Sequence, residues 1–196
     1  MLVVHDAWGL LPHVRARCDQ LAAAGFVVFA PDLYQGGPQP DPPTPDGPLP
    51  PGPEPERARL QLGATAAFLR AHPRVHPVRV GAVGFELGGV LALLLAARGD
   101  VDAVVTHDAV LRPSGRYPIT CPTQGHFAAS DGFDWPSQPK RFFTDLAEGG
   151  APTEYHIYRN TRRPFANPAL PTYAPEAADL AWSRTTTFLR EELTLL

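Results

Sequence analysis

The chain has 196 residues and is 44% hydrophobic, so it is long enough for one domain with a full core and too short for two. Its formal net charge is −3 and no run of like charges stands out, which argues against nucleic acid or an anionic membrane as a partner. We therefore expect one domain over residues 1–196 that takes a small-molecule ligand or substrate.

The longest apolar run, at residues 90–97, is far shorter than the roughly 20 residues that span a bilayer, so no membrane partner is expected. The first residues lack the basic segment of a signal peptide, which predicts a cytoplasmic protein. Cys18 and Cys121 show no paired spacing and are expected to be reduced. No spacing motif predicts a metal or a cofactor, and no pattern indicates the oligomeric state.

The N-terminal part of the chain is predicted to form a strand, a helix and a second strand. An apolar run at residues 2–4 predicts a buried parallel strand, residues 14–24 have helical spacing, and residues 26–30 predict a second strand. This order is typical of a doubly wound α/β sheet. Such sheets bind ligands at the carboxyl ends of their strands, so Asp6 and Trp8, which follow the first strand, stand at the expected site.

Residues 36–55 are rich in proline and have no apolar period, which predicts a loop. A loop of this length is either a lid over the ligand crevice or a mobile excursion on the surface, and both alternatives stay open. Helical spacing resumes at residues 56–71.

The most informative stretch is a buried strand at residues 78–85 that turns abruptly at Glu86 into an apolar helix at 87–98. Gly84 and Gly88 flank the turn, where a Cβ atom would collide with the neighbouring backbone. The pattern is typical of a nucleophile elbow, which raises one side chain above the sheet beside the N-terminus of a helix. That position usually holds Ser or Cys, and in this chain it holds a glutamate.

The remaining predicted elements are strands at residues 101–106, 123–131 and 153–158, and helices at residues 138–148 and 175–193. His107 follows the first of these strands, and the second ends at Asp131. Both side chains are therefore expected at the same edge of the sheet as Asp6 and Glu86.

Four further blocks accompany the elbow Gly-Phe-Glu-Leu-Gly-Gly at residues 84–89. They are His-Asp-Ala-Trp-Gly-Leu at 5–10, Ala-Pro-Asp-Leu-Tyr at 30–34, Gly-His-Phe-x-x-x-Asp at 125–131 and Arg-Pro-Phe-Ala-Asn at 163–167. With the elbow, these blocks resemble the dienelactone hydrolase family over nearly the whole chain. The resemblance implies an α/β-hydrolase fold, with a mainly parallel doubly wound sheet flanked by helices and shortened at the N-terminus.

Members of this family hydrolyse lactones and related esters with a Cys, an Asp and a His. The resemblance places the triad Asp at Asp131, whereas Glu86 stands at the place of the Cys and Arg163 at that of the His. Attack by a carboxylate on an ester would give a costly mixed anhydride, and a permanently protonated arginine is no general base. Lactone hydrolysis by the family mechanism is therefore not expected.

The preferred hypothesis is a non-hydrolytic enzyme. Glu86 would be the acid/base, in a charged cluster with Asp6, Asp131 and Arg163, for isomerisation, dehydration or cyclisation of a small carbonyl compound. The N–H of Leu87 and an N–H near Ala7 or Trp8 would bind the developing oxyanion.

Two alternatives stay open. In one, the protein is catalytically silent, Glu86 and Arg163 form a buried ion pair, and the protein binds a ligand or assists a partner. In the other, it is a hydrolase whose base is His107 or His126, although His126 lies inside a strand and fits a core histidine better.

Several aromatic residues fall in loops or at strand ends around the expected crevice, which favours an apolar ligand over core packing alone. They are Trp8, Tyr34, Phe85, Trp135 and Phe165. The residues expected to bind substrate are Asp6, Ala7, Trp8, Tyr34, Phe85, Leu87, His107 and Phe165.

Overall fold

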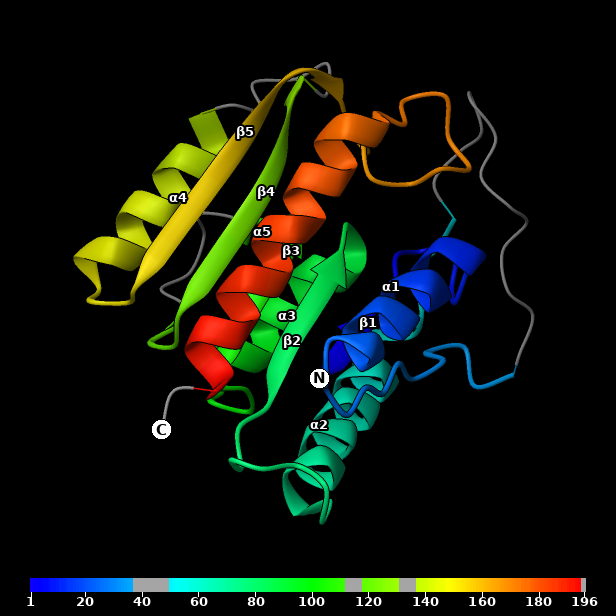
Figure 1. Ribbon diagram of the computed structural model, residues 1–196, viewed down its shortest axis with the longest axis vertical. Coiled ribbons are helices and arrows are strands. Elements are labelled where there is room, and N and C mark those ends of the chain that lie inside the picture. The colour runs from blue at the N-terminus through cyan, green and yellow to red at the C-terminus, as the bar shows by residue number, and fades with distance from the viewer. Residues whose placement is uncertain (37–49, 112–117, 131–136, 195–196) are drawn as a thin grey trace.

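A parallel sheet forms the centre of the computed structural model, which describes residues 1–36, 50–111, 118–130 and 137–194. The strands lie in chain order, so each one neighbours the next along the sequence (Figure 1). They are β1 (Leu2–Val4), β2 (Gly81–Phe85), β3 (Ala103–His107), β4 (Thr123–Ser130) and β5 (Thr153–Arg162). The first three are buried along their whole length, as expected of strands covered on both faces.

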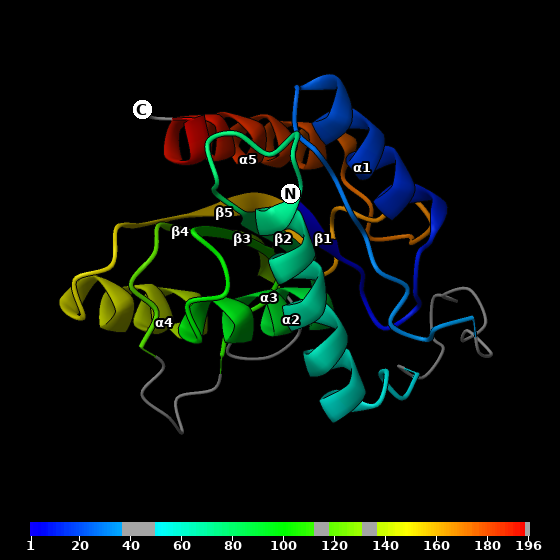
Figure 2. The same cartoon turned by 90° about the horizontal axis from the view of Figure 1, so that it is seen from below.

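Helices cover both faces of the sheet, as Figure 2 shows from the end of the strands. On one face lie α1 (Pro12–Ala23) and α5 (Pro175–Thr194). On the other lie α2 (Pro55–Ala71), α3 (Leu87–Ala97) and α4 (Ser137–Glu148). The fold is therefore an α/β sheet with helices on both sides, as the sequence predicts.

Residues 26–30 do not form the regular strand that the apolar run predicts. Phe29 alone makes an isolated bridge to Leu2, through its N–H to the Met1 carbonyl and its carbonyl to the Val3 N–H, both at 2.9 Å. Turn residues at 24–25 and Pro31 bound the segment closely.

The segment nevertheless fixes the topology of the sheet. It lies beside β1, so the chain passes to the outer side of β1 before it returns through α2 to form β2 on the inner side. The strand order therefore reverses between β1 and β2. In open α/β sheets, ligands bind at this switch point, beyond the carboxyl ends of the two strands.

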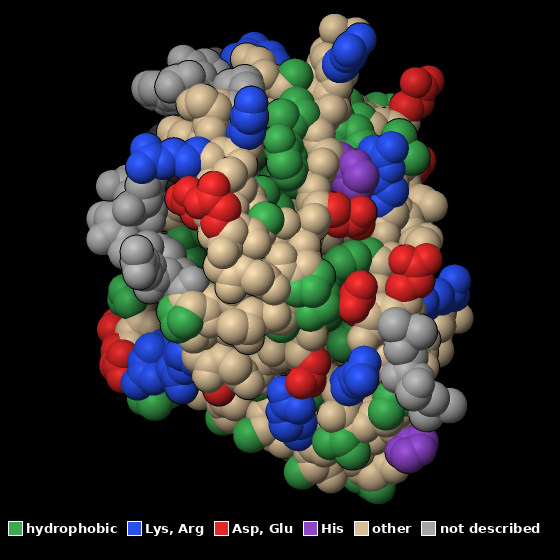
Figure 3. Space-filling view, turned by 90° about the vertical axis from the view of Figure 1, so that its left-hand side faces the viewer, with side chains coloured by type: hydrophobic (Ala, Val, Ile, Leu, Met, Phe, Trp, Pro, Cys, Tyr) green, Lys and Arg blue, Asp and Glu red, His purple; other side chains and the backbone are tan. Residues whose placement is uncertain are grey.

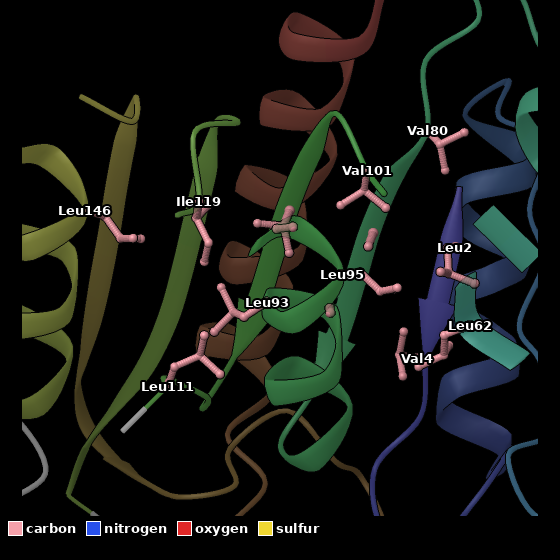
Figure 4. Packing of buried hydrophobic residues seen from close by; sticks show 14 of the residues in the cluster. Leu2, Val4, Leu62, Val80, Leu93, Leu95, Val101, Leu111, Ile119 and Leu146 are labelled. Atoms are coloured by element: carbon pink, nitrogen blue, oxygen red, sulfur yellow. The ribbon is translucent and has the colours of Figure 1, made fainter. Parts of the chain in front are cut away.

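An apolar cluster fills each side of the sheet. Leu2, Val4 and Val104 belong to the cluster that faces α2, α3 and α4, part of which Figure 4 shows. Val3, Val83 and Val105 belong to the cluster under α1 and α5. This alternation along each strand follows from the two-residue period of β structure.

The ends of several elements differ from the predicted ones by a few residues. The largest difference is in β5, which continues to Arg162 rather than ending at residue 158. In α2, the Glu54 side chain accepts hydrogen bonds from the N–H groups of Glu56 and Arg57 and fixes where the helix begins.

Residues 37–49 of the proline-rich segment lie outside the described residues, so the lid and surface-excursion alternatives stay predictions.

Two surface observations bear on partners. On the face that carries α4 and β5, acidic and basic side chains are interspersed, without a large field of either sign (Figure 3). Within the described ranges, no helix is both long and apolar enough to cross a membrane.

Candidate active site

Glu86 occupies a sharp turn between β2 and α3, at φ 51° and ψ −115°. Its N–H donates to the His107 carbonyl at 2.9 Å, and its own carbonyl accepts the first N–H groups of the helix from Gly89 and Val90. A residue with a Cβ atom in such a conformation costs roughly 1–3 kcal/mol. The strand, turn and helix of a nucleophile elbow are therefore all present, with a carboxylate at the tip.

Two glycines let α3 approach the sheet backbone to backbone. A Cβ atom on Gly84 would stand 2.2 Å from the Gly88 carbonyl oxygen. A Cβ atom on Gly88 would stand 2.3 Å from the carbonyl oxygens of both Val4 and His5. These contacts press the start of α3 against the end of β1.

Strand register places three carboxylates at one level. Val4 pairs with Gly84 in β1 and β2, so Asp6 and Glu86 each stand two residues beyond a matched pair. Phe85 pairs with His107 in β2 and β3, so Asp108 follows β3 as Glu86 follows β2. Asp108 was not among the predicted site residues, although its place after the strand predicted at 101–106 was the signal for it.

The carboxyl group of Glu86 lies in direct contact with the guanidinium group of Arg163. The Oε2 atom of Glu86 lies 2.6 Å from Nη2 and 2.8 Å from Nε of Arg163. The Oε1 atom is buried and has no hydrogen-bond partner among the residues that the structure describes. The Arg163 N–H donates to the Ser130 carbonyl at 2.9 Å, which ties the segment after β5 to the end of β4.

Asp6 is held by the backbone and lies near a histidine from α1. Its Oδ1 accepts the Trp8 N–H at 2.9 Å, and its Oδ2 lies 3.8 Å from Nε2 of His13. Both side chains are almost fully buried, at 3% and 8% exposure. Sequence reasoning missed His13, because a helical spacing does not show which turn of α1 faces the end of β1.

Burial, with the charge of Asp108 and a smaller effect of Asp6, raises the pKa of Glu86 to about 8, although Arg163 opposes the rise. Burial likewise raises the pKa of Asp6 to about 6, against the Trp8 N–H, and lowers the pKa of His13 to about 4 with help from Arg17. Near pH 7, Glu86 is therefore mainly protonated, Asp6 mainly ionised and His13 neutral.

Two backbone N–H groups at the site have no acceptor among the residues that the structure describes. Within the described part of the chain, neither Ala7 nor Leu87 donates its N–H to an acceptor. The Trp8 N–H, the alternative donor in the prediction, is bonded to Asp6 instead. The Tyr34 hydroxyl donates to the Ala7 carbonyl, so Tyr34 positions the Ala7 peptide from the other side. Ala7 and Leu87 are thus the candidate oxyanion donors.

The prediction that Phe85 and Phe165 line the crevice does not fit their placement. Phe85 is 5% exposed and packs in the cluster under α1 and α5, with its ring stacked on His107 at 5.0 Å. Phe165 is fully buried, with its ring centroid 5.0 Å from that of Tyr158. Apolar composition in a loop does not show whether a side chain turns toward the crevice or the core. Trp8, at 9% exposure, is also mostly buried.

His107, expected to bind substrate, belongs instead to a row of stacked histidines beneath α5. Its ring lies 4.7 Å from that of His126, and Thr185 Oγ1 lies 3.2 Å and 3.0 Å from their respective Nε2 atoms. Burial lowers the pKa of His107 to about 3 and that of His126 well below its usual value. Strand parity turns both rings toward α5, so the structure gives no support to either as a relocated base.

Asp131 and Trp135 lie outside the described residues, and their roles stay predictions. Within the described ranges, no group of three or more His, Cys, Asp or Glu side chains is arranged to hold a metal ion.

The family model for the dienelactone hydrolase family matches residues 1–193. Protein usf of Aquifex pyrophilus is 27% identical over 204 residues, covering 99% of this chain and 88% of that protein. A putative carboxymethylenebutenolidase of Azospirillum brasilense is 28% identical over 210 residues, covering 98% of this chain and 87% of that protein.

Solved structures show the same fold. A dienelactone hydrolase-like promiscuous phosphotriesterase from metagenomic libraries superposes with a TM-score of 0.79 at 21% identity, covering 97% of this chain and 85% of that one. A putative dienelactone hydrolase from Klebsiella pneumoniae subsp. pneumoniae gives a TM-score of 0.76 at 21% identity, with the same coverage of 97% and 85%. At these identities the similarity shows an α/β-hydrolase fold and nothing finer.

Proposed function

The chain belongs to the dienelactone hydrolase family, and we propose that it is a member that transfers protons on a small carbonyl compound instead of hydrolysing an ester. Glu86 is the proton donor in this proposal. The reaction classes that need only such a group and oxyanion donors are isomerisation, dehydration and cyclisation.

The observation that carries the proposal is the buried Oε1 atom of Glu86, which has no partner among the described residues. Unpaired buried polar atoms are rare and call for an explanation. The raised pKa of Glu86 leaves a proton on this carboxyl group at pH 7. An Oε1–H group without an acceptor is suited to donate to a ligand oxygen.

The neighbouring groups fit this role. Arg163 holds Oε2 through its Nε–H hydrogen bond and a close Nη2 contact, which fixes the orientation of the carboxyl and stabilises it once the proton has left. The N–H groups of Ala7 and Leu87 receive the carbonyl oxygen as it gains negative charge. A positioned general acid contributes roughly 10²–10⁴ in rate, and an oxyanion donor about 10²–10³.

The Glu86→Gln variant tests the proposal. Gln keeps an oxygen for Arg163 but has no acidic proton, so the fold should persist while catalysis falls by about a hundredfold or more. The measurement is exchange of α-protons of acetone, cyclopentanone and acetylacetone for deuterium in D2O, followed by proton NMR at pH 7.

The matched control is Glu191→Gln, which changes an exposed glutamate on α5 and should exchange at the wild-type rate. If the wild-type protein exchanges none of the three ketones faster than Glu86→Gln does, the proposal is wrong.

A second candidate function is supported by the ion pair itself. One charge-assisted hydrogen bond and one close Nη2 contact from Arg163 to the same oxygen are also what a catalytically silent, ligand-binding relative would show. That candidate has Glu86 ionised at neutral pH, as the anionic partner of the Arg163 guanidinium. The protonation state of Glu86 therefore separates the two candidates.

A further inference from the structure

A proton donor alone cannot isomerise a substrate, because a second group has to accept a proton from carbon. We propose that Asp6 is this acceptor, with His13 as its positioning residue, and that the substrate is a small enolisable carbonyl compound whose proton moves between two carbon positions. This inference rests on the proposed function of Glu86 and names the reaction at the same site.

The geometry leaves one oxygen of Asp6 for a ligand. Oδ1 is bound by the Trp8 N–H at 2.9 Å, whereas Oδ2 has no hydrogen bond within the described ranges and lies 3.8 Å from Nε2 of His13. The Asp6 carbonyl accepts the His5 ring Nδ1–H at 2.6 Å and the Gly9 N–H at 3.3 Å, which fixes the backbone. The carboxylate is therefore held with Oδ2 uncommitted.

Asp6 and Glu86 follow two neighbouring strands, β1 and β2. They stand at the same level beyond β1 and β2, at the switch point of the sheet, and the close approach at Gly88 holds these two chain segments together. The Ala7 N–H next to Asp6 and the Leu87 N–H next to Glu86 complete the arrangement. A carbonyl oxygen bound by these two N–H groups would have an acid on one side and a base on the other.

His13 reaches the pair from the first turn of α1. Its ring meets Phe85 edge-on with centroids 6.2 Å apart, and it makes no hydrogen bond within the described part of the chain. In the tautomer with its proton on Nε2, the neutral ring can donate to Oδ2 once the two atoms approach by about 1 Å from their separation of 3.8 Å. His13 thus acts through Asp6.

Burial raises the pKa values of both carboxyl groups, but to different levels. The titratable groups near Asp6 are Glu86, His13 and Tyr34. His13 is also near Arg17. Glu86 is also near Asp108 and Arg163. The pKa of Asp6, about 6, lies below that of Glu86, about 8, so near pH 7 one carboxyl is a base and the other an acid. A pair of titratable groups pushed apart in this way is what acid and base roles require.

The steps balance without another reactant. The C–H bond beside the carbonyl breaks, its proton goes to Oδ2 of Asp6, and its electron pair forms the enol double bond. The carbonyl oxygen takes the proton from Oε1 of Glu86. In a β,γ-unsaturated substrate this enol is a dienol, so Asp6 can return its proton to the γ carbon. Glu86 then regains its own proton from the enol oxygen, the carbonyl re-forms, and the C=C bond has moved to the α,β position. No water is added or lost, which separates this reaction from dehydration.

The Asp6→Asn variant tests the inference by the same deuterium exchange. Asn keeps an oxygen for the Trp8 N–H but cannot accept the proton, so exchange should fall by about a hundredfold or more. Asp19→Asn, on the exposed part of α1, is the matched control and should exchange at the wild-type rate. If Glu86→Gln loses exchange and Asp6→Asn keeps it, this inference is overturned while the proposed function stands. If the wild-type protein gives no exchange, both are overturned.

His13 is tested by the pH profile of exchange. His13→Phe removes the donor to Asp6 and should move the acidic limb of the profile to higher pH, because the Asp6 carboxylate loses stabilisation. His13→Gln retains an N–H donor and should move the limb back toward the wild-type position. A merely structural histidine would change the amount of folded protein and leave the limb in place, and that result would remove His13 from the proposal.

Discussion

The double variant Glu86→Cys with Arg163→His should hydrolyse p-nitrophenyl acetate at least about a hundredfold faster than the unchanged protein. Position 86 keeps the elbow geometry of φ 51° and ψ −115°, which exposes a nucleophile beside the Leu87 N–H. Position 163 already places its side-chain nitrogens within 2.8 Å of the residue 86 carboxylate. A thiol and an imidazole at these positions would therefore be neighbours.

Each single variant is the control for the other. Glu86→Cys has a thiol without a histidine base, and Arg163→His has a base without a nucleophile, so neither should approach the rate of the double variant. The resemblance to the family implies that Asp131 orients the restored histidine. A double variant no faster than Glu86→Cys would show that the site has been reshaped for other chemistry and not changed at two positions alone.

Gly88→Ala should destabilise the protein strongly. The added Cβ atom would lie 2.3 Å from the carbonyl oxygens of Val4 and His5, both of which are backbone atoms of the strand-end region and cannot rotate away. Overpacking against backbone costs up to about 3 kcal/mol and occasionally more, and we expect a loss of that size in the free energy of unfolding. Urea denaturation of the purified variant measures it.

Gly63→Ala is the matched control, because the same methyl group would be added inside α2 with no atom nearer than Arg98 Nη2 at 4.0 Å. It should stabilise the protein by roughly 0.5–1 kcal/mol, since alanine is the better helix former. Equal stability of the two variants would mean that the backbone contact at Gly88 does not hold the end of β1 against α3.

Much of the fold could be predicted from the sequence, because the patterns that carry it are local. Apolar runs and glycine positions indicated β2, the turn at Glu86 and α3 within a few residues. Residues 26–30 were the exception, since an apolar run does not show how many of its backbone groups will face a neighbouring strand. Whether residues 26–30 pair as a strand depends on the position of β1, which is not encoded in that stretch of sequence.

The candidate site was predictable only in part, for a related reason. The positions of Glu86 and Asp6 follow from strand ends, and their partner Arg163 came from the resemblance. Neither the strand ends nor the resemblance shows where a side chain points. Phe85 and His107 were therefore expected at the crevice, whereas the structure places them in the core. His13 and Asp108 required the packing of α1 and the register of β3, which are properties of the assembled sheet.

The central claim is that Glu86 carries a proton at neutral pH and can donate it. The most direct measurement is the pKa of Glu86 from a carbon-13 NMR titration of the glutamate side-chain carboxyls, with Glu86→Gln to identify its resonance. A resonance missing from the variant and titrating near pH 8 is the predicted result. If that resonance titrates below about pH 5, Glu86 is an ionised partner of Arg163 and the acid/base account is wrong.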